Sequence, residues 1–296
     1  QGGRSRYIGN DVFQAGSVSL MASTFIHASA IVEKGAQLGE GVRIGPFCHV
    51  SGDAQLGDNV NLLSGVTVLG ATTIGAGTVV YPNAVLGGAP QNNKHKGGRT
   101  TLTIGMNCVI RESATMHTGS DTGHGTTTVG DNCMFMAYTH VAHDCIVGDN
   151  VTFANNASLS GHCEVGNNVI ISGMTAVHQF VRIGHHAFLG GMSAIVGDVI
   201  PYGMAVGNRA HLRGYNVIGI KRSGLPRSEL LALRKAYRMI FDRDHPVAEN
   251  LEQARKTFID SQAVADVIEF MTSRGKRYFT LPALHGGDDD DDDGED

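Results

Sequence analysis

Several features that define other protein classes are missing from this chain. It contains no tryptophan, and no apolar run reaches the ~18 residues that a membrane-spanning helix needs, so no membrane span is expected. No His-x-x-x-His motif or Cys/His spacing fixes a set of metal ligands. The five cysteines form an odd number without a secretory signal, which indicates a reducing compartment rather than a disulfide framework.

Charge is unevenly distributed along the 296 residues. The formal net charge of −5 depends on residues 288–296, which hold eight acidic groups; without them, 20 acidic groups remain against 23 basic ones. From Arg209 to Arg277, 14 Lys and Arg residues outnumber 8 Asp and Glu residues. This basic region either attracts an acidic partner or is a solvated helical surface.

A six-residue period governs most of the sequence. A large apolar residue occupies every sixth position from Ile26 to Leu86, from Ile104 to Met116 and from Val129 to Ile195, which makes 26 repeats. Four positions after most of them comes a small or β-branched residue, and the Gly, Asn and Asp residues between tolerate the positive φ of tight turns. A helix would show a period of 3.6 and a flat strand a period of 2.

One repeat per side predicts a triangular solenoid, in which three successive repeats close one coil and equivalent positions recur at i and i+18. Parallel strands stack ~4.8 Å apart, so the coils together bury a continuous core that no single coil could bury. The spacing does not decide the handedness, and the usual crossover rule favours right-handed connections.

Two polar, glycine-rich segments interrupt the repeats, at Gly87–Thr103 and His117–Thr128. The interval from Leu86 to Ile104 equals three repeats, so we expect the register to be kept across it. We call these segments the first and second excursions. Loops that leave a rigid scaffold often carry binding groups.

After Asn208 the repeats stop and helical periodicity begins. The predicted helices are Ser228–Asp242, Val247–Phe258 and Gln262–Thr272. Leu231, Tyr237 and Phe241 have helical spacing in the first of them. We therefore divide the chain into an arm at 1–22 (a targeting remnant or a disordered segment), a β-solenoid at 23–210, a helical domain at 211–285 and a disordered acidic tail at 286–296.

Histidine is abundant, with 14 residues, whereas the cysteines all fall in the small inward register and are expected to be inert core residues. Five histidines lie outside both inward registers and within about three and a half coils: His117, His140, His143, His162 and His178. This concentration predicts a site on the outer walls or corners. Because neutral imidazoles also bind zinc, a metal site is the competing interpretation.

The 18-residue coil places His143, Gly161 and Gln179 in one column. No side chain covers the backbone N–H of Gly161, so a general base would lie beside an oxyanion donor, unless Gly161 only serves a turn. Asp144 could orient the His143 imidazole, although neighbours on a strand normally face opposite ways. Asn155, Gly173 and Gly191 form a second column, which predicts an open groove along the wall unless these glycines only supply turns.

Longer motifs carry a specific resemblance. They are Ile110–Ser113, His140–Cys145, Ala154–Ala157 and Gly173–Phe180. From about Thr24 to the helical domain, the chain resembles the UDP-N-acetylglucosamine O-acyltransferase family of hexapeptide-repeat proteins. The resemblance implies a left-handed parallel β-helix with a small C-terminal helical domain. It also implies transfer of a (3R)-3-hydroxyacyl group from acyl carrier protein to the 3-hydroxyl of UDP-N-acetylglucosamine, the first step of lipid A synthesis.

The resemblance also assigns roles to single residues. It implies that His143 is the general base, Asp144 its partner and Gly161 the oxyanion-hole amide. The implied substrate-contacting residues are His117, His140, His162, His178, Gln179, Gln91, Asn92, Lys94, Asn216 and Arg222, with Gly191 as the residue that measures the acyl chain. Two positions depart from the family pattern: Asn92 replaces the usual Asp, and Ser223 replaces a frequent second Arg, which puts substrate affinity in doubt.

The resemblance further implies a homotrimer with active sites between neighbouring prisms, and no cofactor beyond the acyl carrier protein thioester. We expect no nucleic-acid partner. The acidic tail and the arm resemble the plant organellar form, which suggests the mitochondrial matrix, with the bacterial cytoplasm as the alternative. The remaining alternatives are an N-acyltransferase of the same fold, a γ-type carbonic anhydrase with zinc between subunits and a catalytically silent scaffold.

Overall fold

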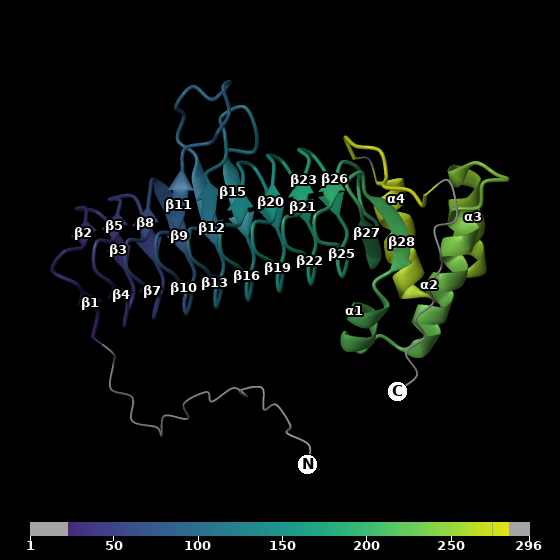
Figure 1. The fold of residues 1–296 in the computed structure, drawn as a ribbon, viewed down its shortest axis with the longest axis horizontal. Coiled ribbons are helices and arrows are strands. Elements are labelled where there is room, and N and C mark those ends of the chain that lie inside the picture. The colour runs from purple at the N-terminus through teal and green to yellow at the C-terminus, as the bar shows by residue number, and fades with distance from the viewer. Residues whose placement is uncertain (1–22, 274, 284–296) are drawn as a thin grey trace, which may run out of the picture.

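The computed structural model describes residues 23–273 and 275–283, so the predicted arm at 1–22 and the tail at 286–296 lie outside the described residues. The chain forms a left-handed parallel β-helix with a small helical region at its C-terminal end (Figure 1). Among the described residues, no helix is both long and apolar enough to cross a bilayer.

Three sheets form the sides of the prism. The first contains β1 (Phe25–Ile26), β4 (Arg43–Ile44), β7 (Asn61–Leu62), β10 (Val79–Val80), β13 (Val109–Ile110), β16 (Met134–Phe135), β19 (Thr152–Phe153), β22 (Ile170–Ile171), β25 (Phe188–Leu189), β27 (Gly203–Val206) and β28 (His211–Tyr215). The second contains β2 (Ile31–Val32), β5 (His49–Val50), β8 (Thr67–Val68), β11 (Val85–Gly88), β14 (Thr115–His117), β17 (His140–Val141), β20 (Ser158–Leu159), β23 (Ala176–Val177) and β26 (Ala194–Ile195). The third contains β3 (Gln37–Leu38), β6 (Gln55–Leu56), β9 (Ala71–Ile74), β12 (Thr101–Ile104), β15 (Thr126–Val129), β18 (Ile146–Val147), β21 (Glu164–Val165) and β24 (Arg182–Ile183).

The six-residue period explains this architecture directly. Each repeat supplies one short strand, and its large apolar residue points inward, as with the fully buried Leu62 and Leu159. The five cysteines are free and buried, as predicted. Identical positions stack from coil to coil, so the rings of Phe135 and Phe153 lie 4.7 Å apart between centroids. Because the coils stack in register, equivalent positions on the outer wall also recur every three repeats. The site residues occupy such equivalent positions.

Both excursions leave the prism between the second and third sheets, and they project side by side (Figure 1). Ile74 pairs with Ile104, which lies five repeat lengths further along the chain instead of three, so the first excursion lengthens one side of a coil. Ile104 pairs in turn with Val129, and the second excursion is the shorter insertion on the same side of the next coil. The core register is kept, as predicted, but the interval from Leu86 to Ile104 forms one side of the triangle and not a whole coil.

In the part of the chain that the structure describes, four helices follow the last strand: α1 (Val217–Arg222), α2 (Arg227–Ile240), α3 (Val247–Thr257) and α4 (Gln262–Thr272). The sequence did not predict α1. The apolar face of α2 was also misplaced, because Leu230 and Leu233 are buried while Leu231 is 47% exposed. β28 pairs antiparallel with β27, so the first sheet continues to Tyr215, past the predicted boundary at residue 210.

Beyond α4, residues 275–283 return to the end of the prism, and we call this segment the C-terminal strap. The Asp198 amide donates to the Tyr278 carbonyl at 2.8 Å, and the Thr280 amide donates to the Asp198 carbonyl at 2.8 Å. The fully buried Asp198 carboxylate accepts a hydrogen bond from Arg182 Nε at 2.7 Å. The strap is therefore anchored to the last coil by backbone hydrogen bonds.

Candidate active site

His143 and Asp144 form a hydrogen-bonded pair at a corner of the prism. His143 Nδ1 lies 2.7 Å from Asp144 Oδ2. Neighbouring residues on a strand could not make this contact, but Asp144 follows β17 at a corner and has a φ of 59°. The left-handed backbone turns its side chain back toward His143. Because an ionised carboxylate only accepts hydrogen bonds, the proton lies on Nδ1, and Nε2 of the neutral ring is left with a lone pair.

The second excursion covers Asp144. The Ser120 hydroxyl donates to Asp144 Oδ2 at 2.6 Å, and the amides of Ser120 and Gly125 donate to Oδ1 at 3.0 and 3.1 Å. Burial by itself raises the pKa of Asp144, but the hydrogen bonds from Ser120 and His143 outweigh it and lower that pKa to about 2. Asp144 therefore stays ionised at neutral pH and fixes the orientation of His143.

Gly161 lies directly beside the His143 ring, one coil further along. A Cβ atom at Gly161 would approach Cε1 of His143 to 2.7 Å and Nε2 to 2.8 Å. Within the described residues, no acceptor receives the Gly161 N–H. The column predicted from the 18-residue coil thus places a free backbone donor next to the unprotonated nitrogen of His143.

His162 and Phe180 continue the same corner over the next two coils. The His162 ring packs edge-on against His143, with centroids 5.1 Å apart, and stacks on Phe180 at 4.6 Å. Burial, partly opposed by Asp144, lowers the pKa of His162. The cluster therefore favours neutral imidazoles beside a single buried carboxylate.

His117 and His140 form a second pair on the same wall, with ring centroids 4.9 Å apart. His140 Nδ1 lies 2.8 Å from the Thr115 hydroxyl, whereas the buried Nδ1 of His117 has no partner among the described residues. Burial, with His117 and His143 nearby, lowers the pKa of His140 to about 4. These two imidazoles are neutral hydrogen-bonding groups at neutral pH.

The first excursion carries Gln91, Asn92 and Lys94, with Gln91 and Lys94 exposed. Asn92 Nδ2 donates to the Thr122 hydroxyl at 3.2 Å, and Asn92 Oδ1 accepts the Lys94 amide at 3.0 Å. The departure from the family's Asp therefore has a local consequence, since the amide group of Asn92 ties the two excursions together.

Gln179 and His178 lie near the C-terminal strap, and Gly191 lies in the second column. The exposed Gly191 has room for a side chain, because a Cβ there would lie 3.4 Å from the Gly173 carbonyl oxygen. Gly173 is equally open toward Asn155. Two successive coils therefore leave this position of the wall without a side chain, whereas the open groove itself stays a prediction.

Asn216 and Arg222 lie apart from the histidine cluster. Asn216 caps α1 by accepting the Gly219 amide at 3.0 Å, and its Nδ2 donates to the His186 carbonyl at 3.1 Å. Arg222 is exposed at the last turn of α1, and Ser223 forms its C-cap. The His186 carbonyl that Asn216 contacts lies more than two coils after His143, so Asn216 and Arg222 stand beyond the histidine cluster, toward the C-terminal end of the prism.

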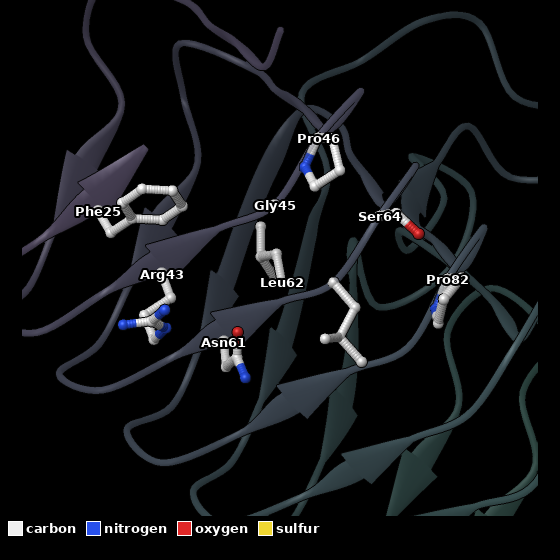
Figure 2. Close-up of a pocket in the computed structure, with 9 residues that line it drawn as sticks. Phe25, Arg43, Gly45, Pro46, Asn61, Leu62, Ser64 and Pro82 are labelled. Atoms are coloured by element: carbon white, nitrogen blue, oxygen red, sulfur yellow. The ribbon is translucent and has the colours of Figure 1, made fainter. Parts of the chain in front are cut away.

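A cavity of about 460 Å³ opens on the first sheet, near the N-terminal end of the prism. Figure 2 shows Phe25, Arg43, Pro46 and Pro82 around it. None of the predicted site residues lines this cavity. The histidine cluster is instead an open strip on the wall and corner of the prism.

His143, Asp144 and His162 could also hold a metal ion, because one ligand atom from each lies within 4.8 Å of the others. The donor set fits zinc only in part, since the hydrogen bonds from Ser120, Gly125 and His143 already occupy the carboxylate. A hydrogen-bonded base and its orienting carboxylate describe these contacts better.

Three residues at the site were missed in the sequence. Ser120 lies in a loop whose path no periodicity predicts. Phe180 follows the Gln179 position, and the column containing Asp144 and His162 could have identified it. Arg277 reaches His178 from a segment almost a hundred residues away in sequence.

The coiled prism, its hexapeptide repeats and a histidine–carboxylate pair beside a free amide define a hexapeptide-repeat acyltransferase. Residues 53–88 and 126–161 match the bacterial transferase hexapeptide family, and residues 198–278 match domain 2 of UDP-N-acetylglucosamine O-acyltransferase. The chain belongs to the UDP-N-acetylglucosamine O-acyltransferase family.

Three relatives document this membership. An acyl-[acyl-carrier-protein]–UDP-N-acetylglucosamine O-acyltransferase of Mesorhizobium japonicum is 65% identical, over 92% of this chain and 98% of the relative. The UDP-N-acetylglucosamine acyltransferase structure from Campylobacter jejuni has a TM-score of 0.82 and 38% identity, covering 87% of this chain and all of the other. The Arabidopsis enzyme structure has a TM-score of 0.76 and 34% identity, covering 86% and 100%. The prediction of a plant mitochondrial form is therefore not supported, because identity is much higher to a bacterial relative.

Proposed function

We propose that this chain transfers an acyl group from acyl carrier protein to UDP-N-acetylglucosamine, the first step of lipid A synthesis. The observation that carries the proposal is the His143–Asp144 pair, whose ring lies directly beside Gly161. Two relatives that align with almost the whole chain are named for this activity.

The chemistry follows from the positions of the protons. His143 Nε2 removes the proton of a sugar hydroxyl, and the oxygen attacks the thioester carbonyl carbon. The oxyanion of the tetrahedral intermediate accepts a hydrogen bond from the Gly161 N–H. When the C–S bond breaks, the carrier's thiolate takes the proton from His143. Asp144 remains ionised and stabilises the imidazolium that forms between the two proton transfers.

The finer assignments remain proposals. We infer that the acyl group is a (3R)-3-hydroxyacyl chain and that the acceptor is the 3-hydroxyl of the glucosamine. His117, His140, His162, His178 and Gln179 are then the substrate contacts along the wall. The family resemblance supports this set, and so does the row of neutral imidazoles that can exchange hydrogen bonds with sugar hydroxyls.

No metal or organic cofactor is required for this transfer. Zinc at His143, Asp144 and His162 is the second candidate, favoured by the spacing of their ligand atoms. Elemental analysis of the purified protein separates the two interpretations, because a zinc enzyme retains about one ion per chain and loses activity to a chelator.

We further propose that the enzyme is a homotrimer in the bacterial cytoplasm. The family resemblance supports a site shared between neighbouring prisms, and Asn216 and Arg222 lie more than two coils beyond His143. Tyr138, Met174 and Met192, each more than 60% exposed at one corner, add apolar surface for such contacts. The bacterial relatives support the location.

The deciding experiment measures acyl transfer to UDP-N-acetylglucosamine with a series of acyl carrier protein donors. In His143→Ala, turnover should fall about 10² to 10⁴-fold, because the general base is lost while the fold survives. His245→Ala, an exposed histidine in the helical region, is the matched control and should leave turnover unchanged. Normal turnover in folded His143→Ala excludes this base, and no transfer by the wild type excludes the function.

A further inference from the structure

The C-terminal strap places a guanidinium group against the substrate-facing wall. Arg277 Nε donates to the Gln179 carbonyl oxygen at 2.9 Å, and Arg277 Nη2 lies 2.5 Å from His178 Nδ1. These two nitrogens are on the same edge of the guanidinium, so Arg277 contacts the neighbouring residues His178 and Gln179 at the same time. His178 and Gln179 are both predicted substrate contacts, whereas Arg277 lies outside the repeats.

The strap holds Arg277 at a fixed height along the prism. Directly after it, the Tyr278 carbonyl accepts the Asp198 amide at 2.8 Å, and the buried Thr280 donates its hydroxyl to the Gly197 carbonyl at 3.0 Å. Directly before it, the Lys276 ammonium lies 4.3 Å from the centroid of Phe180, the ring that stacks on His162. These contacts on either side hold the backbone of Arg277 next to His178 and Gln179.

Two contacts of His178 Nδ1 require opposite tautomers. Nδ1 lies 3.2 Å from the Gln179 carbonyl oxygen, and it could donate to that oxygen only if it carried the proton. Arginine has no acceptor, so the contact with Arg277 requires a lone pair on Nδ1. The arginine contact is the shorter one, and the Gln179 oxygen already has a donor in Arg277 Nε. With Arg277 present, the proton of neutral His178 therefore lies on Nε2.

We propose that Arg277 is a positioning residue that holds His178 as the Nε2–H tautomer, so that His178 presents a hydrogen-bond donor to an oxygen of the bound substrate. This inference rests on the proposed function in one respect, namely that a substrate lies along the column of His143, Gly161 and Gln179. His178 is exposed beside that column, so a hydroxyl or carbonyl oxygen of a bound substrate can reach it. Without Arg277, Nδ1 would donate to the Gln179 carbonyl, and Nε2 would become an acceptor.

Solid-state ¹⁵N spectra of histidine-labelled protein at about pH 8, where ordinary histidine is neutral, report the tautomer directly. His178→Gln identifies the His178 signals by their loss. The wild type should show a protonated Nε2, and Arg277→Ala should show a protonated Nδ1. Arg277→Lys should keep the wild-type tautomer, since lysine also only donates. Lys276→Ala is the matched control, because it removes the neighbouring strap cation and leaves the Arg277 contact in place.

Transfer kinetics test whether the tautomer matters to the reaction. Loss of the His178 donor in Arg277→Ala should lower kcat/KM about tenfold, the value of one hydrogen bond. In a His178→Ala background the same substitution should have almost no further effect, because Arg277 acts through His178. Arg277→Lys should recover part of the activity.

The outcomes separate two kinds of failure. A protonated Nδ1 in the wild type, an unchanged tautomer in Arg277→Ala, or a full Arg277→Ala effect in the His178→Ala background each overturns the role of Arg277. Absence of transfer by the wild type overturns the proposed function instead, while the spectra still decide the tautomer.

Discussion

The His143 ring occupies the space that a side chain at Gly161 would need. A methyl group at Gly161 would meet two atoms of the imidazole at less than 3 Å, which is closer than real Cβ contacts. The glycine is needed for this approach and not for its backbone conformation, because its φ is not positive. The proposed base and the proposed oxyanion donor therefore lie directly beside each other.

This shared volume predicts the behaviour of Gly161→Ala. The new methyl group displaces the imidazole and covers the amide, so kcat should fall at least about 10²-fold, as for the loss of an oxyanion donor. The substitution faces a side chain outside the core, so the melting temperature should change little. Steady-state kinetics with circular dichroism melts check both expectations. Turnover close to that of the wild type would contradict the assignment of Gly161.

At the scale of strands and loops, the proposed measurement of the acyl chain depends on how successive coils stack along the wall. Asn155, Gly173 and Gly191 stand in one column, and Cβ atoms at the two glycines would meet no atom closer than 3.4 Å. An acyl chain that starts at the thioester near Gly161 can run along this strip. Each further methylene in such a groove contributes ~0.8 kcal/mol, or about fourfold in affinity.

The column predicts a change in donor preference for Gly191→Met. The native enzyme should prefer a long 3-hydroxyacyl donor, and the methionine should block the last two to four carbons or so and shift preference to a shorter one. The measurement is relative kcat/KM over donors of increasing length, with the fold and assembly verified. An unchanged ranking would show that the chain ends elsewhere.

The half-buried His140 on β17 should make the stability of the fold sensitive to acid. Its pKa, near 6.5 when unfolded, is about 4 in the folded chain, because burial disfavours the charged ring. Between these two pH values the unfolded state therefore binds more protons than the folded state. The free energy of unfolding is thus highest above about pH 6.5 and decreases as the pH falls toward 4.

Replacing His140 by glutamine should remove this loss. Between pH 7 and pH 5 the wild type should lose about 2 kcal/mol more free energy of unfolding than His140→Gln. Urea unfolding at both pH values and at matched protein concentration measures the difference. Parallel losses in the two proteins would mean that His140 is not the group that titrates.

For the whole molecule, the excess of basic residues between Arg209 and Arg277 predicts how the donor docks. Acyl carrier protein is acidic, and attraction between exposed charges is screened beyond ~10 Å at 0.1 M salt. The KM for the carrier-bound donor should therefore rise with salt, whereas a short acyl-thioester donor without the carrier should show no such dependence. A KM for the carrier-bound donor that does not respond to salt argues against electrostatic docking.

The six-residue period by itself determined the positions of the strands, the columns of equivalent positions and the burial of the cysteines. It could do so because each repeat buries its side chains in the same way as its neighbours. It also placed His143, Gly161 and Gln179 together. The α2 register failed because packing against α3 and α4, not spacing alone, selects the buried face.

Only the tertiary structure decided contacts between segments that no period relates. Asp144 meets His143 because of its left-handed corner conformation, and it stays ionised because a loop brings Ser120 over it. Arg277 reaches His178 because the strap pairs with the last coil after four helices. Local repetition can be read along the chain, whereas the path of a loop or strap depends on the free energy of contacts across the whole fold.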